Sequence, residues 1–101
     1  MIPKILETLH HAPDVYKEAD RFMEALDWII WQMTGEETRS ACGAGYKAFY
    51  RHDSGYPTKD FFKALDPAME NIVEEKLDAP IKSIGETAGY LTDSMARELG
   101  L

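Results

Sequence analysis

Most of what this chain can fold into is set by the spacing of its apolar residues. Within residues 3–10 they recur every third or fourth position, which predicts a short amphipathic helix. The same spacing returns in residues 15–33 and in residues 69–77. A strand would instead require alternation at every second residue. Most of the chain is therefore predicted to be helical.

Residues that begin and end helices divide this pattern into separate segments. A side-chain oxygen at a helix start accepts a hydrogen bond from a free backbone N–H, and proline fits the first turn because it lacks an N–H. Glycine adopts the left-handed conformation that often ends a helix. The expected starts and ends are Pro13, Thr58, Asp66, Thr92, Gly35 and Gly100. Whether residues 13–33 form one bent helix or two is left open by the periodicity.

The helical pattern is interrupted in the middle of the chain. Residues 40–45 have almost no side-chain bulk, and such a run lets another backbone or a ligand come close. Residues 46–50 are rich in aromatic side chains, which favours a strand, and residues 81–84 are expected to form another brief strand. The expected fold class is mainly α with one or two short β-strands, in a single unit of 101 residues.

Composition excludes several classes of partner. The formal net charge is −7, from 18 acidic and 11 basic residues, and the basic residues are spread along the chain. Neither nucleic acid nor an anionic membrane surface is an expected partner, since both require a clustered basic face. No apolar run is long enough to span a bilayer. The single cysteine, Cys42, cannot form an internal disulfide, and a cytoplasmic location is expected.

Lys47 is the residue with the most informative surroundings. It follows the small residues and lies between Tyr46 and Phe49, in the expected strand. A lysine on an edge strand commonly stays solvated and prevents aggregation, and the residues alone favour this role. The three donors of its ammonium group could instead hold the hydroxyl or phosphate oxygens of a ligand.

Other candidate residues favour structural interpretations. Trp28 and Trp31 could stack on a sugar ring, but their helical spacing within residues 26–33 favours a core position. That segment is apolar nearly all round, which is typical of a helix buried on several sides. Cys42 has no close basic neighbour except Arg39, so a small buried filler is favoured over a nucleophile. The sequence contains no zinc-ligand spacing and no phosphate-loop motif, and predicts no catalytic and no metal-binding residue.

Four stretches, taken in chain order, carry a family resemblance. They are residues 25–35 (Ala-Leu-Asp-Trp-Ile-Ile-Trp-Gln-Met-Thr-Gly), 42–48 (Cys-Gly-Ala-Gly-Tyr-Lys-Ala), 55–67 (Gly-Tyr-Pro-Thr-Lys-Asp-Phe-Phe-Lys-Ala-Leu-Asp-Pro) and 84–101. Together they resemble the FGGY carbohydrate kinases, and the second and third resemble the ribulokinase branch in particular. The resemblance implies that residues 1–101 are an internal segment of the N-terminal, sugar-binding domain, which is an actin-like or RNase H-like α/β domain.

The resemblance also implies an activity for the intact kinase. Its substrate would be L-ribulose or a similar pentulose, phosphorylated by ATP with Mg²⁺ in arabinose catabolism. Lys47 matches a lysine that contacts the sugar, which favours a substrate-binding role. Gly43 departs from the family, which often has threonine there. The family's catalytic aspartate, phosphate hairpin and nucleotide domain have no counterpart in this chain, so the segment alone is expected to bind no cofactor and to be inactive.

Two further expectations concern partners. In the intact kinase, helices of this segment would pack against a sheet that the segment alone lacks. In the isolated segment, apolar surface around Trp28, Trp31, Phe49 and Phe61 would then be exposed, which favours a homo-oligomer or a loosely packed monomer. The alternative function, from a different class, is a self-sufficient small helical protein-interaction module without enzymatic activity. That alternative requires one well-packed core and a defined protein partner.

Overall fold

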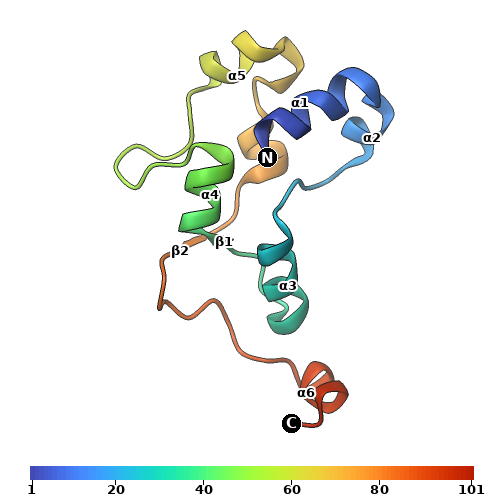
Figure 1. Cartoon of the computed structure of the whole chain (residues 1–101), viewed down its shortest axis with the longest axis vertical. Helices are drawn as coiled ribbons and strands as arrows, with labels where there is room; N and C mark the ends of the chain where they lie inside the picture. The colour runs from blue at the N-terminus through green and yellow to red at the C-terminus, as the bar shows by residue number, and fades with distance from the viewer.

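A computed structural model describes residues 1–101 and confirms the mainly helical fold class. The α-helices are α1 (Ile2–His11), α2 (Pro13–Glu18), α3 (Ala25–Thr34), α4 (Ala41–Ala48), α5 (Lys59–Leu65) and α6 (Asp93–Leu99). A 3₁₀ turn, η1 (Pro67–Met69), and a π-helical turn, η2 (Val73–Leu77), follow α5. Strands β1 (Arg39–Ser40) and β2 (Ile81–Lys82) pair in parallel (Figure 1). None of the helices combines the length and the apolar character that crossing a membrane requires.

The helix boundaries follow the expected signals. The side chains of Thr58, Asp66 and Thr92 each accept a hydrogen bond from a backbone N–H two or three residues further on. Gly35 and Gly100 end α3 and α6 with φ angles of 73° and 74°. A residue with a Cβ atom is strained in that conformation, whereas glycine is not. These helix starts and ends are therefore determined by local contacts, and their predicted positions are confirmed.

The strand predicted for residues 46–50 is wrong. Ala41–Ala48 is helical, because Ser40 begins a helix there: its Oγ accepts a hydrogen bond from the backbone N–H of Gly43 at 3.3 Å. An N-capping hydroxyl outweighs the weak strand preference of the aromatic residues that follow. The helix ends at Phe49, the one non-glycine residue with a positive φ, 59°.

Residues 13–33 form two helices, and the second is less buried than predicted. Residues 19–24 separate α2 from α3. In α3, Leu26, Trp28 and Ile29 are each about half exposed, at 47%, 52% and 49%. The core position favoured for Trp28 is therefore wrong, and the only buried side chain of α3 is a polar one, Asp27. The periodicity of the sequence predicted an apolar helix correctly, but it could not predict which faces of that helix are covered by other parts of the chain.

The core lies at one end of the molecule. Figure 1 shows α1, α2 and α5 gathered above α4, with the η2 turn beside them. The buried apolar residues of this core are Ile2, Ile5, Tyr16, Ala48, Phe62, Met69, Ile72 and Leu77. Phe62 is wholly buried, whereas its neighbour Phe61 is 40% exposed. Neither α3 nor α6 contributes a residue to this core.

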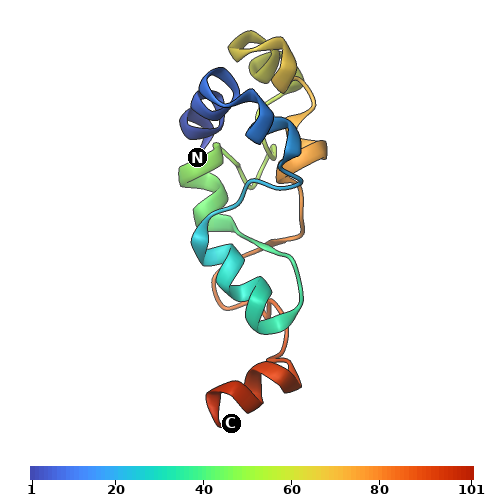
Figure 2. The same ribbon diagram turned by 90° about the vertical axis from the view of Figure 1, so that its right-hand side faces the viewer.

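The chain is elongated, with extents of 48 × 34 × 17 Å. Figure 2 shows α6 at the end opposite the core, joined by an extended segment. The backbone N–H of Thr92 donates to the carbonyl of Met33 at 3.0 Å and holds that segment against the end of α3. The radius of gyration is 15.2 Å, against about 13 Å for a compact domain of this length. The surface of 6760 Å² exceeds the roughly 5,800 Å² expected for an 11.5 kDa monomer.

Candidate functional site

Lys47 lies in the last turn of α4, and its side chain is exposed. A cation at this position complements the partial negative charge at a helix C-terminus. The lysines that hydrogen-bond to other residues are Lys4, Lys59 and Lys76, and none of the ion pairs includes Lys47. Its ammonium group is therefore free to bind the oxygens of a ligand.

The helical setting of Lys47 removes one interpretation of it. A solvated lysine that guards a strand edge requires a strand, and Lys47 belongs to α4 instead. The protective role that the residues alone favoured is thus excluded by the fold. Its substrate-binding role, which the family resemblance implies, stays a prediction.

An open hollow of about 390 Å³ lies beside Lys47, between α4, α1 and the segment before α3. It is lined by Met1, Lys4, Ile5, Thr8, Phe22, Met23, Glu24 and Lys47. The side-chain polar groups here are two ammonium groups, a hydroxyl and a carboxylate, and the carboxylate, that of Glu24, lies 4.0 Å from the N-terminal ammonium of Met1. Groups of these kinds donate to and accept from sugar hydroxyls.

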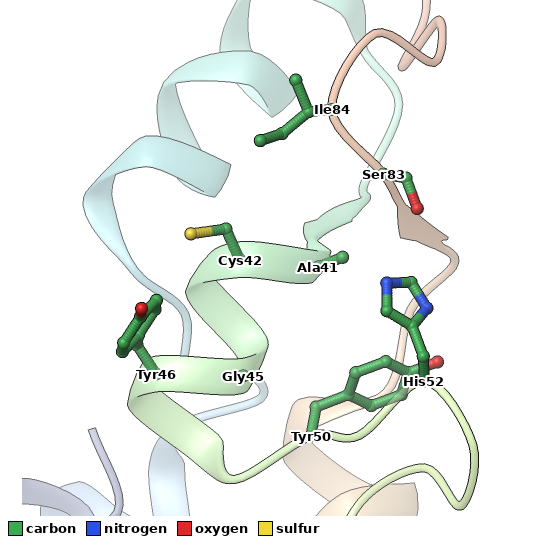
Figure 3. A pocket seen from close by; sticks show the side chains of 8 residues that line it. All are labelled: Ala41, Cys42, Gly45, Tyr46, Tyr50, His52, Ser83 and Ile84. Atoms are coloured by element: carbon green, nitrogen blue, oxygen red, sulfur yellow. The ribbon is translucent and has the colours of Figure 1, made fainter.

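A larger groove of about 640 Å³ lies along a different face of α4. Its lining residues are Ala41, Cys42, Gly45, Tyr46, Tyr50, His52, Ser83 and Ile84 (Figure 3). They come from α4, from the loop that follows it and from the segment after β2. Lys47 does not line this groove, so the structure does not bring the predicted substrate-binding residue into it.

Cys42 is exposed in this groove, and the prediction of a small buried filler is wrong. Its place on the outer face of α4 follows from the helix, since Gly43 and Ala44 occupy the buried face. The rings of Tyr50 and His52 pack edge to face, with their centroids 6.1 Å apart. Cys42 and His52 both line the groove, but no hydrogen bond joins them, and such a contact is how a base activates a nucleophile.

A buried carboxylate lies at the other end of α4, and sequence reasoning missed it. Asp27 of α3 is only 4% exposed, and its Oδ1 accepts a hydrogen bond from the backbone N–H of Ser40 at 2.8 Å. Burial raises the pKa of the Asp27 carboxyl above its ordinary value, and the Ser40 N–H and the nearby Arg39 guanidinium oppose that rise. The only sequence signal was an acidic residue inside an otherwise apolar helix.

A second buried group joins β1 to η2. Arg39 is 3% exposed; its Nε donates to the carbonyl of Leu77 at 3.0 Å and its Nη2 to the carboxylate of Glu37 at 2.8 Å. Glu37 also accepts from Arg21 at 3.1 Å. A buried guanidinium needs such partners, because an unpaired buried charge is costly. This network is structural and holds the strand from which α4 starts.

The chain shows no arrangement suited to a metal ion. No three histidine, cysteine, aspartate or glutamate side chains lie close enough together to hold one. The arrangement around α4 can contribute hydrogen bonds and charge to a polar ligand.

Comparisons with known proteins identify the source of this arrangement. No family model matches the chain. Curated ribulokinases match it over all 101 residues: the enzyme of Geobacillus thermodenitrificans is 50% identical, that of Anoxybacillus flavithermus 48% and that of Staphylococcus aureus 42%. The chain spans 18% of the length of each of these relatives.

These matches support the chain being part of a sugar kinase domain, and its mainly helical fold is consistent with that. Within that class the chain is similar, over all 101 of its residues, to an internal segment of these ribulokinases, as the stretches around Trp28 and Lys47 indicated. The alternative of a self-sufficient interaction module is not favoured, because the similarity extends over the whole chain and leaves no separate unit to explain.

Proposed function

We propose that this segment belongs to a ribulokinase that phosphorylates L-ribulose, or a similar pentulose, with ATP in the cytoplasm as a step of arabinose catabolism. The observation that carries the proposal is the 50% identity over 101 residues with a relative named ribulokinase. Identity at this level over an unbroken segment favours a shared substrate class, and the segment is the part of that kinase proposed here to meet the sugar.

The proposed role of the segment is to bind substrate as part of the N-terminal, sugar-binding domain. Lys47 would hold the pentulose hydroxyls so that one of them faces the phosphate donor. Its exposed ammonium group, which has no protein partner, and the polar hollow beside it that includes Thr8 and Glu24 support this role. Holding reacting groups in the right geometry supplies much of the catalysis of phosphoryl transfer.

The phosphate donor is proposed to bind outside this segment. ATP·Mg²⁺ requires a phosphate-binding loop and oxygen ligands for the metal ion. The chain has neither a phosphate-loop motif nor a group of three side chains placed to hold a metal ion. Its residues therefore do not fit that cofactor, and the proposal gives them no part in handling it.

The test of this function is a transplant of residues 1–101 in place of the matching segment of the Geobacillus thermodenitrificans ribulokinase. The transplanted kinase should phosphorylate L-ribulose with a kcat/KM within about tenfold of its parent, a difference of about 1.4 kcal/mol in the barrier. The parent with the segment deleted is the matched control and should be inactive. A folded transplant that phosphorylates no pentulose would contradict the proposal.

We also propose that the isolated chain self-associates through its exposed apolar side chains. Trp28, Phe49 and Phe61 are 52%, 49% and 40% exposed, whereas Trp31 is partly buried. The total surface of 6760 Å² exceeds that of a compact monomer by about 1,000 Å². A standard interface buries about 800 Å² on each partner, so one interface would cover most of the excess.

Sedimentation velocity over a concentration series should show this association. Trp28→Glu should shift the chain toward monomer, because a carboxylate on the exposed face of α3 opposes burial of that face. Val15→Glu is the control, since Val15 is 57% exposed on α2 and lies outside the proposed surface. A wild-type chain that remains monomeric at every concentration would contradict the proposed association.

A further inference from the structure

Helix α4 has little of its own to hold it in place. It is eight residues long, and two of these, Gly43 and Gly45, lack side chains. Short helices are marginal without tertiary support, and interior glycines weaken them further. Its last turn is anchored because Ala48 is wholly buried in the core. At the start of the helix Gly43 and Ala44 are also buried, but between them they present a single methyl group, so the first turn has little side chain to anchor it.

An anchor for the first turn is supplied by a different helix. In a capping box, the N-cap side chain accepts from the N–H three residues on, and the acidic side chain at that position accepts from the N-cap N–H. Ser40 makes the first of these bonds, with the N–H of Gly43. Gly43 has no side chain to make the second. Asp27 of α3 makes it instead, at 2.8 Å from the Ser40 nitrogen.

The packing around Gly43 fits this division of roles. A Cβ atom built on Gly43 would lie 3.6 Å from a methyl carbon of Leu26, in van der Waals contact. Leu26 of α3 thus lies next to the start of α4, at a distance that a Cβ atom at position 43 would also fit. That approach places the carboxylate of Asp27, the next residue of α3, at the Ser40 amide.

We propose that Asp27 is a positioning residue for Lys47: it completes the N-terminal cap of α4 from outside the helix and so fixes the helix that presents Lys47 to the sugar. The inference rests on the proposed function. Lys47 lies seven residues beyond Ser40, about two helical turns along α4. Loss of the cap frays the start of α4 and leaves the helix held at one end only, by Ala48. The orientation of the last turn, and with it the place of Lys47 beside the hollow, is then less well fixed.

Three substitutions in the transplanted kinase test the proposal. Asp27→Asn keeps an acceptor oxygen at the same place and should leave the KM for L-ribulose within about twofold of the parent. Asp27→Glu keeps the charge but moves the oxygens by one methylene, and Asp27→Ala removes the acceptor. Both should raise that KM, the alanine variant by about tenfold, with the KM for ATP unchanged.

If Asp27 had a merely structural role, or acted through its charge, the three variants would change the KM values differently. Equal increases in both KM values, or no change in any variant, would overturn the proposal. So would an impaired asparagine variant beside a normal glutamate variant, because the charge would then be what matters. If the alanine variant does not fold, the comparison of the asparagine and glutamate variants still decides.

Amide hydrogen exchange in the 101-residue chain gives a readout that needs no activity. Asp27→Ala should speed exchange in α4 by about tenfold, and Asp27→Asn should not. The amides of α6 serve as the internal control, since α6 lies at the far end of the molecule. Unchanged exchange in α4 would overturn the positioning role. An inactive transplant with altered exchange would instead count against the proposed function alone.

Discussion

Replacing Lys47 with alanine in the transplanted kinase is expected to lower kcat/KM for L-ribulose by about tenfold to a hundredfold. The reason is the loss of charge-assisted hydrogen bonds to the sugar, which are worth about 1.5–3 kcal/mol when the partner is buried in a complex. Lys47 has no ion pair within the chain, so its removal should leave folding intact. The measurement is steady-state kinetics with varied L-ribulose at saturating ATP.

Lys63→Ala is the matched control for this experiment. Lys63 is also exposed, also lies in the last turn of a short helix, α5, and forms no ion pair. Its removal should leave kcat/KM within the error of the measurement. Lys47→Arg should give an intermediate value, because it keeps the charge but replaces a compact ammonium with a planar fork. If the variants at positions 47 and 63 behave alike, Lys47 is a surface residue without a role in the sugar site.

The helix boundaries could be predicted because their causes are local. Thr58, Asp66 and Thr92 each act on an amide two or three residues away, so the pattern that predicts a cap contains both partners. The same holds for Gly35, whose left-handed conformation depends on its missing Cβ atom. The mainly α fold class follows from the sum of such local signals.

The strand expected for residues 46–50 shows where local signals conflict. The aromatic residues favoured extended structure, while Ser40 and the small residues after it permitted a helix. The Ser40 hydroxyl caps the helix locally, while the Ser40 amide donates to Asp27, thirteen residues earlier in the chain, and no local pattern contains that second contact. The sequence showed that this region was unusual and that Lys47 lay within it, but not which face of which element carried the lysine.

Burial was predicted least well, because it depends on what covers each face. The apolar character of α3 is evident from the sequence, yet Trp28 and Ile29 are about half exposed. A helix of a larger domain shows the same pattern, and this chain spans only 18% of its curated relatives. Arg39 shows the reverse error, a charged side chain that is buried. Its burial could not be predicted, because its partners Leu77 and Glu37 contact its side chain only in the folded chain.

The most direct test of the account uses the 101-residue chain alone, with L-ribulose, ATP and Mg²⁺, and the transplanted kinase as the positive control. A segment that contributes a sugar contact but no residues for ATP·Mg²⁺ cannot transfer phosphate, since both reactants must be held together. The predicted result is ADP release no faster than in the protein-free blank, under conditions in which the transplant turns over. Sustained release of ADP that depends on L-ribulose, and that is lost in the Lys47→Ala chain, would contradict the account.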